Sequence, residues 1–334
     1  MPRVTPAVLV SALALTLAGC GATAQGGSDG PGAVSGAAPS PAAPATITVA
    51  ANNGTVEVPT RPQRVVALDN SSFETLEAFG ITPVAAPKQL LPENLGEWAR
   101  NGDILDVGTH REPKLEVVAQ AQPDLIIGGK RFAKVTPDLQ KLAPVLDLAP
   151  STEKDGYVDA LKKQTQTLGE IFGKQAEATQ LITALDRSVE AAVKESSGQR
   201  AFLANHNGGR LDNGAGRIGV LLQPLKVTDV FETKADNASV HQDSGLAPET
   251  VAQKNPDVLI VMDRDAAVSS TRDTATPASQ TVAAQKAWAG TTFMKNDAIV
   301  YLADNFYVTE GIQAYTDAYT KIADVLGKST GTSS

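Results

Sequence analysis

The apolar positions of the chain fall into short continuous runs that are followed by stretches with helical periodicity. Residues 64–68 form such a run, and Ser71 with Glu74 three residues later has the spacing of a helix capping box. This pattern predicts a buried strand that turns into a helix ending near Gly80. A strand followed by a helix favours a parallel sheet.

Two segments of the chain repeat one pattern. Residues 116–131 (EVVAQAQPDLIIGGKR) and 249–264 (ETVAQKNPDVLIVMDR) align without a gap and match at 8 of 16 positions. Each copy predicts a helix, a Pro-Asp break, a continuous apolar strand and then an arginine. The repeat predicts two lobes built on one plan. Convergence on a common helix-to-strand connection is the alternative, and it also leaves two α/β units.

The segment between the two copies is strongly helical. Residues 157–196 carry two apolar stripes at helical spacing, separated by a pause at Gly173. The stripes consist of Leu161, Leu168, Ile171 and Phe172, and of Ala178, Leu181, Ile182, Leu185, Val189 and Ala192. A stiff helical connection between similar lobes predicts modest rocking rather than wide closure.

Together these patterns predict an α/β protein with two lobes, each with a mainly parallel central sheet and flanking helices, joined by a rigid helical spine. The chain has 334 residues, which is enough for two compact units. We place the N-terminal lobe at residues 46–155, the helical connector at 156–197, the C-terminal lobe at 198–330 and a tail at 331–334.

The first 45 residues predict export and anchoring rather than a folded unit. Residues 1–19 hold an apolar segment that is too short to span a membrane but suits a secretory signal. The segment ends in LAGC, which resembles the lipobox of bacterial lipoproteins, so we expect a lipid on Cys20; an ordinary signal peptide with an incidental cysteine is the alternative. Residues 20–45 are rich in Gly, Ala, Ser and Pro and predict a flexible tether. The expected location is the outer face of the cytoplasmic membrane.

Composition narrows the classes of function. The chain has 29 Lys and Arg against 37 Asp and Glu, a formal charge of −8, and lacks a basic block, which argues against nucleic acid as a partner. A single cysteine excludes an internal disulfide framework and any multi-cysteine zinc or iron–sulfur site. Three histidines are few for a histidine-rich metal site.

Two arginines at the predicted strand ends are candidate ligand-binding residues. Arg131 and Arg264 close the two repeats, and ligands of open parallel sheets bind beyond the carboxyl ends of the strands. If the lobes face each other, the two guanidinium groups converge on one cleft. Their planar fork of donors suits a delocalised anion. Taken singly, each arginine also fits a strand-end salt bridge.

Further candidates lie in the C-terminal lobe. Residues 205–219 follow a predicted strand at 201–204 and contain a Gly-x-Gly-x-x-Gly pattern, but the polar segment before the glycines argues against a dinucleotide site. We expect a mobile hairpin or loop that presents Arg217. His241 precedes the second repeat, and Tyr307 lies beyond a predicted strand at 298–302. Histidine nitrogen and phenolate oxygen both ligate ferric iron, although such residues also serve as hydrogen-bonding scaffold.

A series of motifs along the chain resembles one family of transport proteins. The motifs are the lipobox, residues 64–68, Gly108-Thr109 before Pro113 and Glu116, Pro123-Asp124 with Arg131, Arg217-Ile218-Gly219, His241, Pro256-Asp257 with Arg264, and Tyr301-Leu302 before Phe306-Tyr307. Over residues 46–328 the chain resembles the solute-binding lipoproteins of bacterial iron–siderophore ABC importers, which are class III periplasmic binding proteins, and it is close to the catecholate-siderophore group.

The resemblance implies a shallow cleft that holds a ferric siderophore as transported ligand, with no tightly bound cofactor and no enzymatic activity. Its arginines, Arg131, Arg217 and Arg264, would bond catecholate oxygens. His241 and Tyr307 match positions that complete the iron shell in some relatives when the siderophore is tetradentate. Two exposed acids, Glu116 and Glu249, match those that dock on the permease. The implied protein is a lipid-anchored monomer that works with permease and ATPase subunits.

The chain also departs from the family pattern. Gln242 replaces a usual glycine, Phe306 replaces a usual tryptophan, and Glu310 places a carboxylate near a site proposed for an anion. The ligand therefore stays open between a ferric catecholate and a ferric hydroxamate, haem or cobalamin; zinc or manganese fits the scarce histidines worst. A lipid-anchored hydrolase is the alternative from another class, and Gly-x-Ser-x-Gly and His-Glu-x-x-His motifs are absent from the sequence.

Overall fold

A computed structural model describes residues 45–109, 112–151, 156–231, 246–268 and 271–331. The predicted signal peptide, Cys20 and nearly all of the predicted tether lie outside these residues, as does His241. The body from Pro44 onward is one compact unit. Within the described ranges, no helix has the length and apolar character needed to cross a bilayer.

A five-stranded sheet organises the first half of the body, and every strand pair in it is parallel. The strand order is β5-β4-β3-β6-β7, and the central strands are buried on both faces, which explains their continuous apolar runs. The strands are β3 (Val65–Ala67), β4 (Ala85–Ala86), β5 (Leu105–Asp106), β6 (Leu125–Gly128) and β7 (Val145–Asp147). The helices are α1 (Phe73–Ala78), α2 (Gly96–Arg100), α3 (Leu115–Gln120) and α4 (Thr136–Leu139), with 3-10 helices η1 (Asn70–Ser72), η2 (Lys88–Leu90), η3 (Glu93–Leu95) and η4 (Lys130–Val135).

An antiparallel hairpin precedes this sheet, and the sequence analysis did not predict it. It consists of β1 (Thr46–Ala51) and β2 (Gly54–Pro59), paired from Thr46↔Pro59 to Ala51↔Gly54. Half of its residues are exposed, and only Val49 and Val58 are buried. Its larger apolar residues alternate along each strand and pack against the first core, a period-2 signal that the sequence analysis did not use.

A second sheet organises the other half. Its strand order is β10-β8-β11-β12, all parallel, and β9 pairs antiparallel with β8. The strands are β8 (Arg200–Asn207), β9 (Arg210–Asn213), β10 (Thr228–Asp229), β11 (Val258–Asp263) and β12 (Ile299–Tyr301). The helices are α7 (Ala215–Ile218), α8 (Pro248–Lys254), α9 (Arg264–Ala267), α10 (Ala278–Ala283), α11 (Thr292–Lys295) and α12 (Phe306–Thr309), with 3-10 helices η5 (Gly219–Leu222) and η7 (Lys286–Trp288). Two mainly parallel sheets with flanking helices confirm the predicted fold class.

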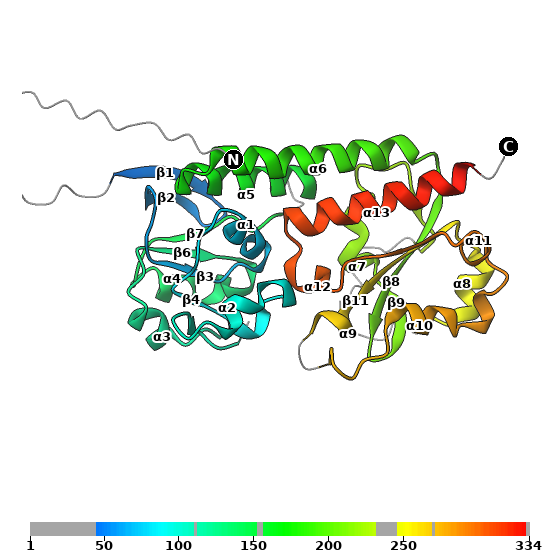
Figure 1. Cartoon of the computed structure of the whole chain (residues 1–334), viewed down its shortest axis with the longest axis horizontal. Helices are drawn as coiled ribbons and strands as arrows, with labels where there is room; N and C mark the ends of the chain where they lie inside the picture. The colour runs from blue at the N-terminus through cyan, green and yellow to red at the C-terminus, as the bar shows by residue number, and fades with distance from the viewer. Residues whose placement is uncertain (1–44, 110–111, 152–155, 232–245, 269–270, 332–334) are drawn as a thin grey trace, which may run out of the picture. The chain divides into compact units, whose positions relative to one another are not determined.

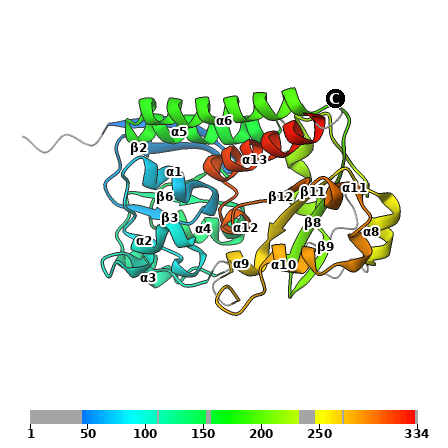
Figure 2. The ribbon, with the colours of Figure 1, turned by 45° about the vertical axis from the view of Figure 1, so that its right-hand side comes forward.

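Three long helices lie along one side of the molecule, and the last of them packs in the core of the second sheet (Figures 1 and 2). They are α5 (Tyr157–Phe172), α6 (Gln175–Glu195) and α13 (Ile312–Gly331). In α5, Leu161 packs in the core of the second sheet, whereas Leu168 packs in that of the first. In α6, Ala178 belongs to the first core and Leu185 to the second. Each of these two helices is therefore part of both cores, as the predicted spine requires.

The internal repeat has a structural basis at its Pro-Asp step. Asp124 accepts a hydrogen bond from the backbone N–H of Arg64 (2.9 Å), and Asp257 accepts one from that of Arg200 (2.8 Å). In each case the aspartate N–H also donates to the carbonyl of the same arginine. Each arginine side chain in turn donates to a backbone carbonyl at the end of the helix of the repeat. The repeated aspartate thus holds the start of a neighbouring strand, at Arg64 just before β3 and at Arg200 in β8.

The predicted capping box at Ser71 and Glu74 is wrong. Asp69 caps η1 instead, accepting from the backbone N–H and the hydroxyl of Ser71. Glu74 points elsewhere and accepts from the side-chain amides of Asn94 (2.7 Å) and Asn305 (3.0 Å). A local spacing rule failed here because distant residues supply the better partners. The predicted end of the helix is confirmed, because α1 stops at Ala78 and Gly80 has a positive φ.

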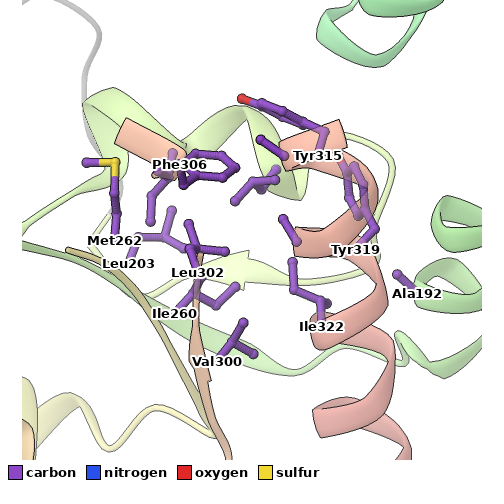
Figure 3. Packing of buried hydrophobic residues seen from close by; sticks show 14 of the residues in the cluster. Ala192, Leu203, Ile260, Met262, Val300, Leu302, Phe306, Tyr315, Tyr319 and Ile322 are labelled. Carbon is purple, nitrogen blue, oxygen red and sulfur yellow. The ribbon is translucent and has the colours of Figure 1, made fainter. Parts of the chain in front are cut away.

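Aromatic packing fixes the segment after β12. Figure 3 shows Phe306, Tyr315 and Tyr319 in one apolar cluster with Ile260 and Val300. The rings of Phe306 and Tyr315 are 5.3 Å apart, and Tyr315 also stacks on another ring, that of α5 residue Tyr157, at 4.7 Å. Phe306 is fully buried. Because Phe306 anchors α12, the next residue along this helix, Tyr307, has a defined position.

Candidate functional site

Arg131 follows the carboxyl end of β6. Gly129 allows the chain to leave the strand, because a Cβ there would lie 2.9 Å from a carboxylate oxygen of Asp69. Arg131 then lies in η4, and its Nε donates to Oδ1 of Asn70 (3.1 Å). Asn70 in turn donates to the carbonyl of Val308 in α12 (2.8 Å). One amide side chain therefore links Arg131 to the helix that carries Tyr307.

Arg217 and Arg264 share the ring of Tyr307. The guanidinium carbon of Arg217 lies 4.4 Å from the ring centroid, and that of Arg264 lies 5.5 Å from it. Arg217 also donates from Nη2 to the Tyr307 carbonyl (3.1 Å). Both distances are within the range of cation–π contacts. The structure thus brings together four of the five predicted ligand-binding residues, and the fifth, His241, lies outside the described residues.

Arg217 reaches this position by a route that differs from the expected loop. The strand predicted at 201–204 continues to Asn207 as β8 and turns back as β9 through Gly208 and Gly209, both with positive φ. Arg217 lies beyond this hairpin in the short helix α7. The expected hairpin is therefore present, but it is α7 that carries the arginine.

Glu310 lies beside the group formed by Arg131, Arg217, Arg264 and Tyr307, which we call the arginine cluster. Its Oε1 is 2.9 Å from Nε of Arg217, an ion pair in which the N–H is poorly aligned for a hydrogen bond. Its side chain is 21% exposed and its backbone adopts φ 49°, a left-handed conformation at the end of α12. Burial raises the pKa of Glu310, and Arg217, Arg131 and Lys130 oppose this rise. The sequence placed Glu310 near the proposed anion site, and in the structure its carboxylate directly contacts Arg217.

A buried network that sequence reasoning missed positions Arg264. The carboxylate of Asp263, the last residue of β11, contacts the ring of His206 (2.9 Å) and accepts from the N–H groups of Ala266 and Ala278. Burial opposes ionisation of Asp263, but these bonds, with His206 first, lower its pKa overall. Arg264 itself donates to Asn207 (3.0 Å), while its buried Nε has no hydrogen-bond partner among the residues that the structure describes.

The two predicted docking acids occupy equivalent places. Glu116 lies in the first turn of α3 and Glu249 in the first turn of α8, and both are exposed. These are the helices of the internal repeat. An exposed acid in a first helical turn is also favourable to the helix itself, so the placement alone assigns no partner.

A hollow of about 350 Å³ is lined by residues of both halves, and some of these residues are close in sequence to Arg264 and Tyr307. It is lined by Glu93, Asn94, Ala266, Arg272, Asp304 and Asn305. Arg272 and Glu93 approach to 3.7 Å across it. A larger hollow, about 480 Å³, lies beside β2 and β7 and includes none of the predicted site residues among its lining. We therefore locate the site by its charge rather than by cavity size.

Comparison with known proteins agrees with this architecture. Residues 65–305 match the family model described as periplasmic binding protein. The petrobactin-binding protein YclQ of Bacillus subtilis is 31% identical over 83% of this chain and 86% of its own. The ferric-anguibactin-binding protein FatB of Vibrio anguillarum is 28% identical over 79% and 82%.

Solved structures show the same fold. The crystal structure of YclQ has a TM-score of 0.70 at 26% identity, and it covers 84% of this chain and 99% of that one. BauB, solved with acinetobactin and ferric iron, has a TM-score of 0.72 at 23% identity with the same coverage. The family model spans both sheets and every arginine of the cluster. The chain belongs to the periplasmic binding protein family.

Proposed function

We propose that this chain is the extracytoplasmic solute-binding component of an ABC importer and captures a ferric siderophore, of catecholate type, for iron uptake. The relatives that support this are named as binding proteins for petrobactin and for ferric anguibactin. The observation that carries the proposal is the placement of Arg217 and Arg264 against the ring of Tyr307, with Arg131 linked through Asn70 to the same helix.

The chemistry of the cluster suits a ferric catecholate. Deprotonated catecholate oxygens are strong acceptors on a planar ring, and guanidinium groups offer a matching planar set of donors. Arg131 comes from the first half of the body, whereas the other two arginines come from the second, so an anion held by all three bridges the halves. Tyr307, with His241, stays a proposed iron ligand for a tetradentate siderophore.

Replacing the arginines tests the binding site. A charge-assisted hydrogen bond contributes about 1.5–3 kcal/mol, so we expect Arg131→Ala and Arg264→Ala each to weaken ferric-catecholate binding by at least about tenfold. Tryptophan fluorescence reports binding, and titration with ferric hydroxamate, haem and cobalamin tests the alternative ligands. Arg187→Ala, an exposed arginine of α6, is the matched control. Unchanged affinity in both cluster variants would remove the assigned site.

Delivery to a permease is the second part of the proposal. Because Glu116 and Glu249 are exposed at equivalent helix starts, we expect the double alanine variant to lose uptake while it keeps siderophore affinity. The matched control replaces two exposed acids of the spine, Glu170 and Glu190. Normal iron uptake by cells that carry the Glu116→Ala and Glu249→Ala changes would refute this docking role. The lipid on Cys20 and the monomeric state belong to the same proposal.

A further inference from the structure

The arginine cluster carries a negative charge of its own. Glu310 pairs with Arg217 at 2.9 Å and lies within electrostatic reach of Arg131 and Lys130. The second acid of the cluster is Asp265, 4.0 Å from Nη1 of Arg264. Asp265 differs from Glu310 because its other oxygen accepts from the backbone of Gly209, so it is bound into the hairpin. Of these two acids, Glu310 is thus the one whose carboxylate is engaged with the arginines rather than bound into the hairpin.

Glu310 is held in place by its backbone rather than by its carboxylate alone. Its carbonyl accepts from the hydroxyl of Tyr157 (3.0 Å), and its N–H donates to the carbonyl of Phe306. The following residue, Gly311, lies so close to the backbone of Ser71 that a side chain there would collide with it. The backbone of Glu310 therefore has a defined position, from which its carboxylate reaches Arg217.

We infer that Glu310 is an internal counter-ion that sets the charge class of the ligand, so that the site favours ferric chelates of low net negative charge. This inference rests on the proposed function. Ferric iron with three catecholates has a charge of −3, and with two catecholates from a tetradentate ligand it has −1. Each extra negative charge on the chelate meets the charge of Glu310 in a partly desolvated place, where repulsion is stronger than in water. The trianion is accordingly penalised more than the monoanion.

The test measures the ratio of two dissociation constants. The probes are the ferric tris-catecholate of charge −3 and a ferric bis-catecholate of charge −1, titrated against purified wild type and Glu310→Gln. We expect Glu310→Gln to move the ratio in favour of the trianion by at least about tenfold, because one unit of repulsive charge is removed at close range. Glu310→Ala removes the same charge and moves the ratio in the same direction. Glu310→Asp keeps the charge and leaves the ratio close to that of wild type.

The controls separate charge selection from simple positioning of Arg217. If Glu310 only oriented Arg217, both neutral variants would weaken the two chelates alike and the ratio would stay constant, which overturns the inference. Glu77→Gln, an exposed acid of α1, removes the same charge away from the cluster and leaves the ratio unchanged. A wild-type protein that binds neither chelate would refute the proposed function instead. A wild type that binds both, with a ratio that Glu310→Gln does not move, refutes this inference alone.

Discussion

Gly311 makes a contact between the halves that leaves no room for a side chain, and Gly311→Ala should therefore destabilise the body. A Cβ at this position would lie 2.5 Å from the carbonyl oxygen of Ser71. Ordinary Cβ contacts begin near 3.4 Å, so the deficit is 3.4 − 2.5 = 0.9 Å. Ser71 cannot move easily, because its hydroxyl donates to Asp69 (2.7 Å) and accepts from Gln164 (2.9 Å). Overpacking of this kind costs about 1–3 kcal/mol.

Urea unfolding measures this cost. We expect the free energy of unfolding of Gly311→Ala to fall by at least about 1 kcal/mol. The matched control is Gly290→Ala, where a Cβ would meet nothing within 4 Å, and its change should stay within about 0.5 kcal/mol. Siderophore affinity should fall as well, because the Asn70–Val308 hydrogen bond that joins the arginine groups spans the same contact. Equal stability of the two variants would refute the described packing of the halves.

Two further predictions concern carboxylates that the site does not use directly. Burial raises the pKa of Asp69 from 3.8 to about 6, so the folded state holds this proton more tightly than the unfolded state. The stability that this proton provides is complete below about pH 4 and is lost as the pH rises through 6, by about 3 kcal/mol at ~1.4 kcal/mol per pKa unit. Asp69→Asn should flatten this decline in urea midpoints measured from pH 4 to 7, and an unaltered slope would contradict it. Asp124→Ala and Asp257→Ala should each lower the free energy of unfolding by about 0.5–1.5 kcal/mol, because the backbone N–H groups of Arg64 and Arg200 at the strand starts lose their carboxylate acceptors. Thermal unfolding of both variants checks the equivalence of the two repeats, and a stable Asp257→Ala protein would show that they differ.

Local patterns in the sequence were sufficient to predict the parallel sheets, the helical spine and the arginine ends of the repeats. They succeeded because each signal lies within one element: a continuous apolar run for β6 and β11, or a stripe at helical spacing for α5 and α6. The β1–β2 hairpin was missed because its core-facing apolar residues alternate with exposed ones and form no continuous run.

Long-range polar contacts were beyond the reach of those patterns. Gln164 donates to Asp69 across 95 residues of sequence, and His206 contacts Asp263 across 57. No periodicity reports such pairs, since their partners are set by how the elements pack. Glu310 was noted only as a neighbour in sequence of the predicted site, and its pairing with Arg217 depends on the fold of α7 against α12.

The way α5 and α6 enter both cores has a consequence for how the protein comes apart. If one sheet melted, Leu161 and Leu185 or Leu168 and Ala178 would lose their packing, and the helix that carries them would be left half exposed. Neither sheet has a complete core without these helices. The body should consequently unfold by heat or denaturant in a single cooperative transition, although it contains two separate sheets.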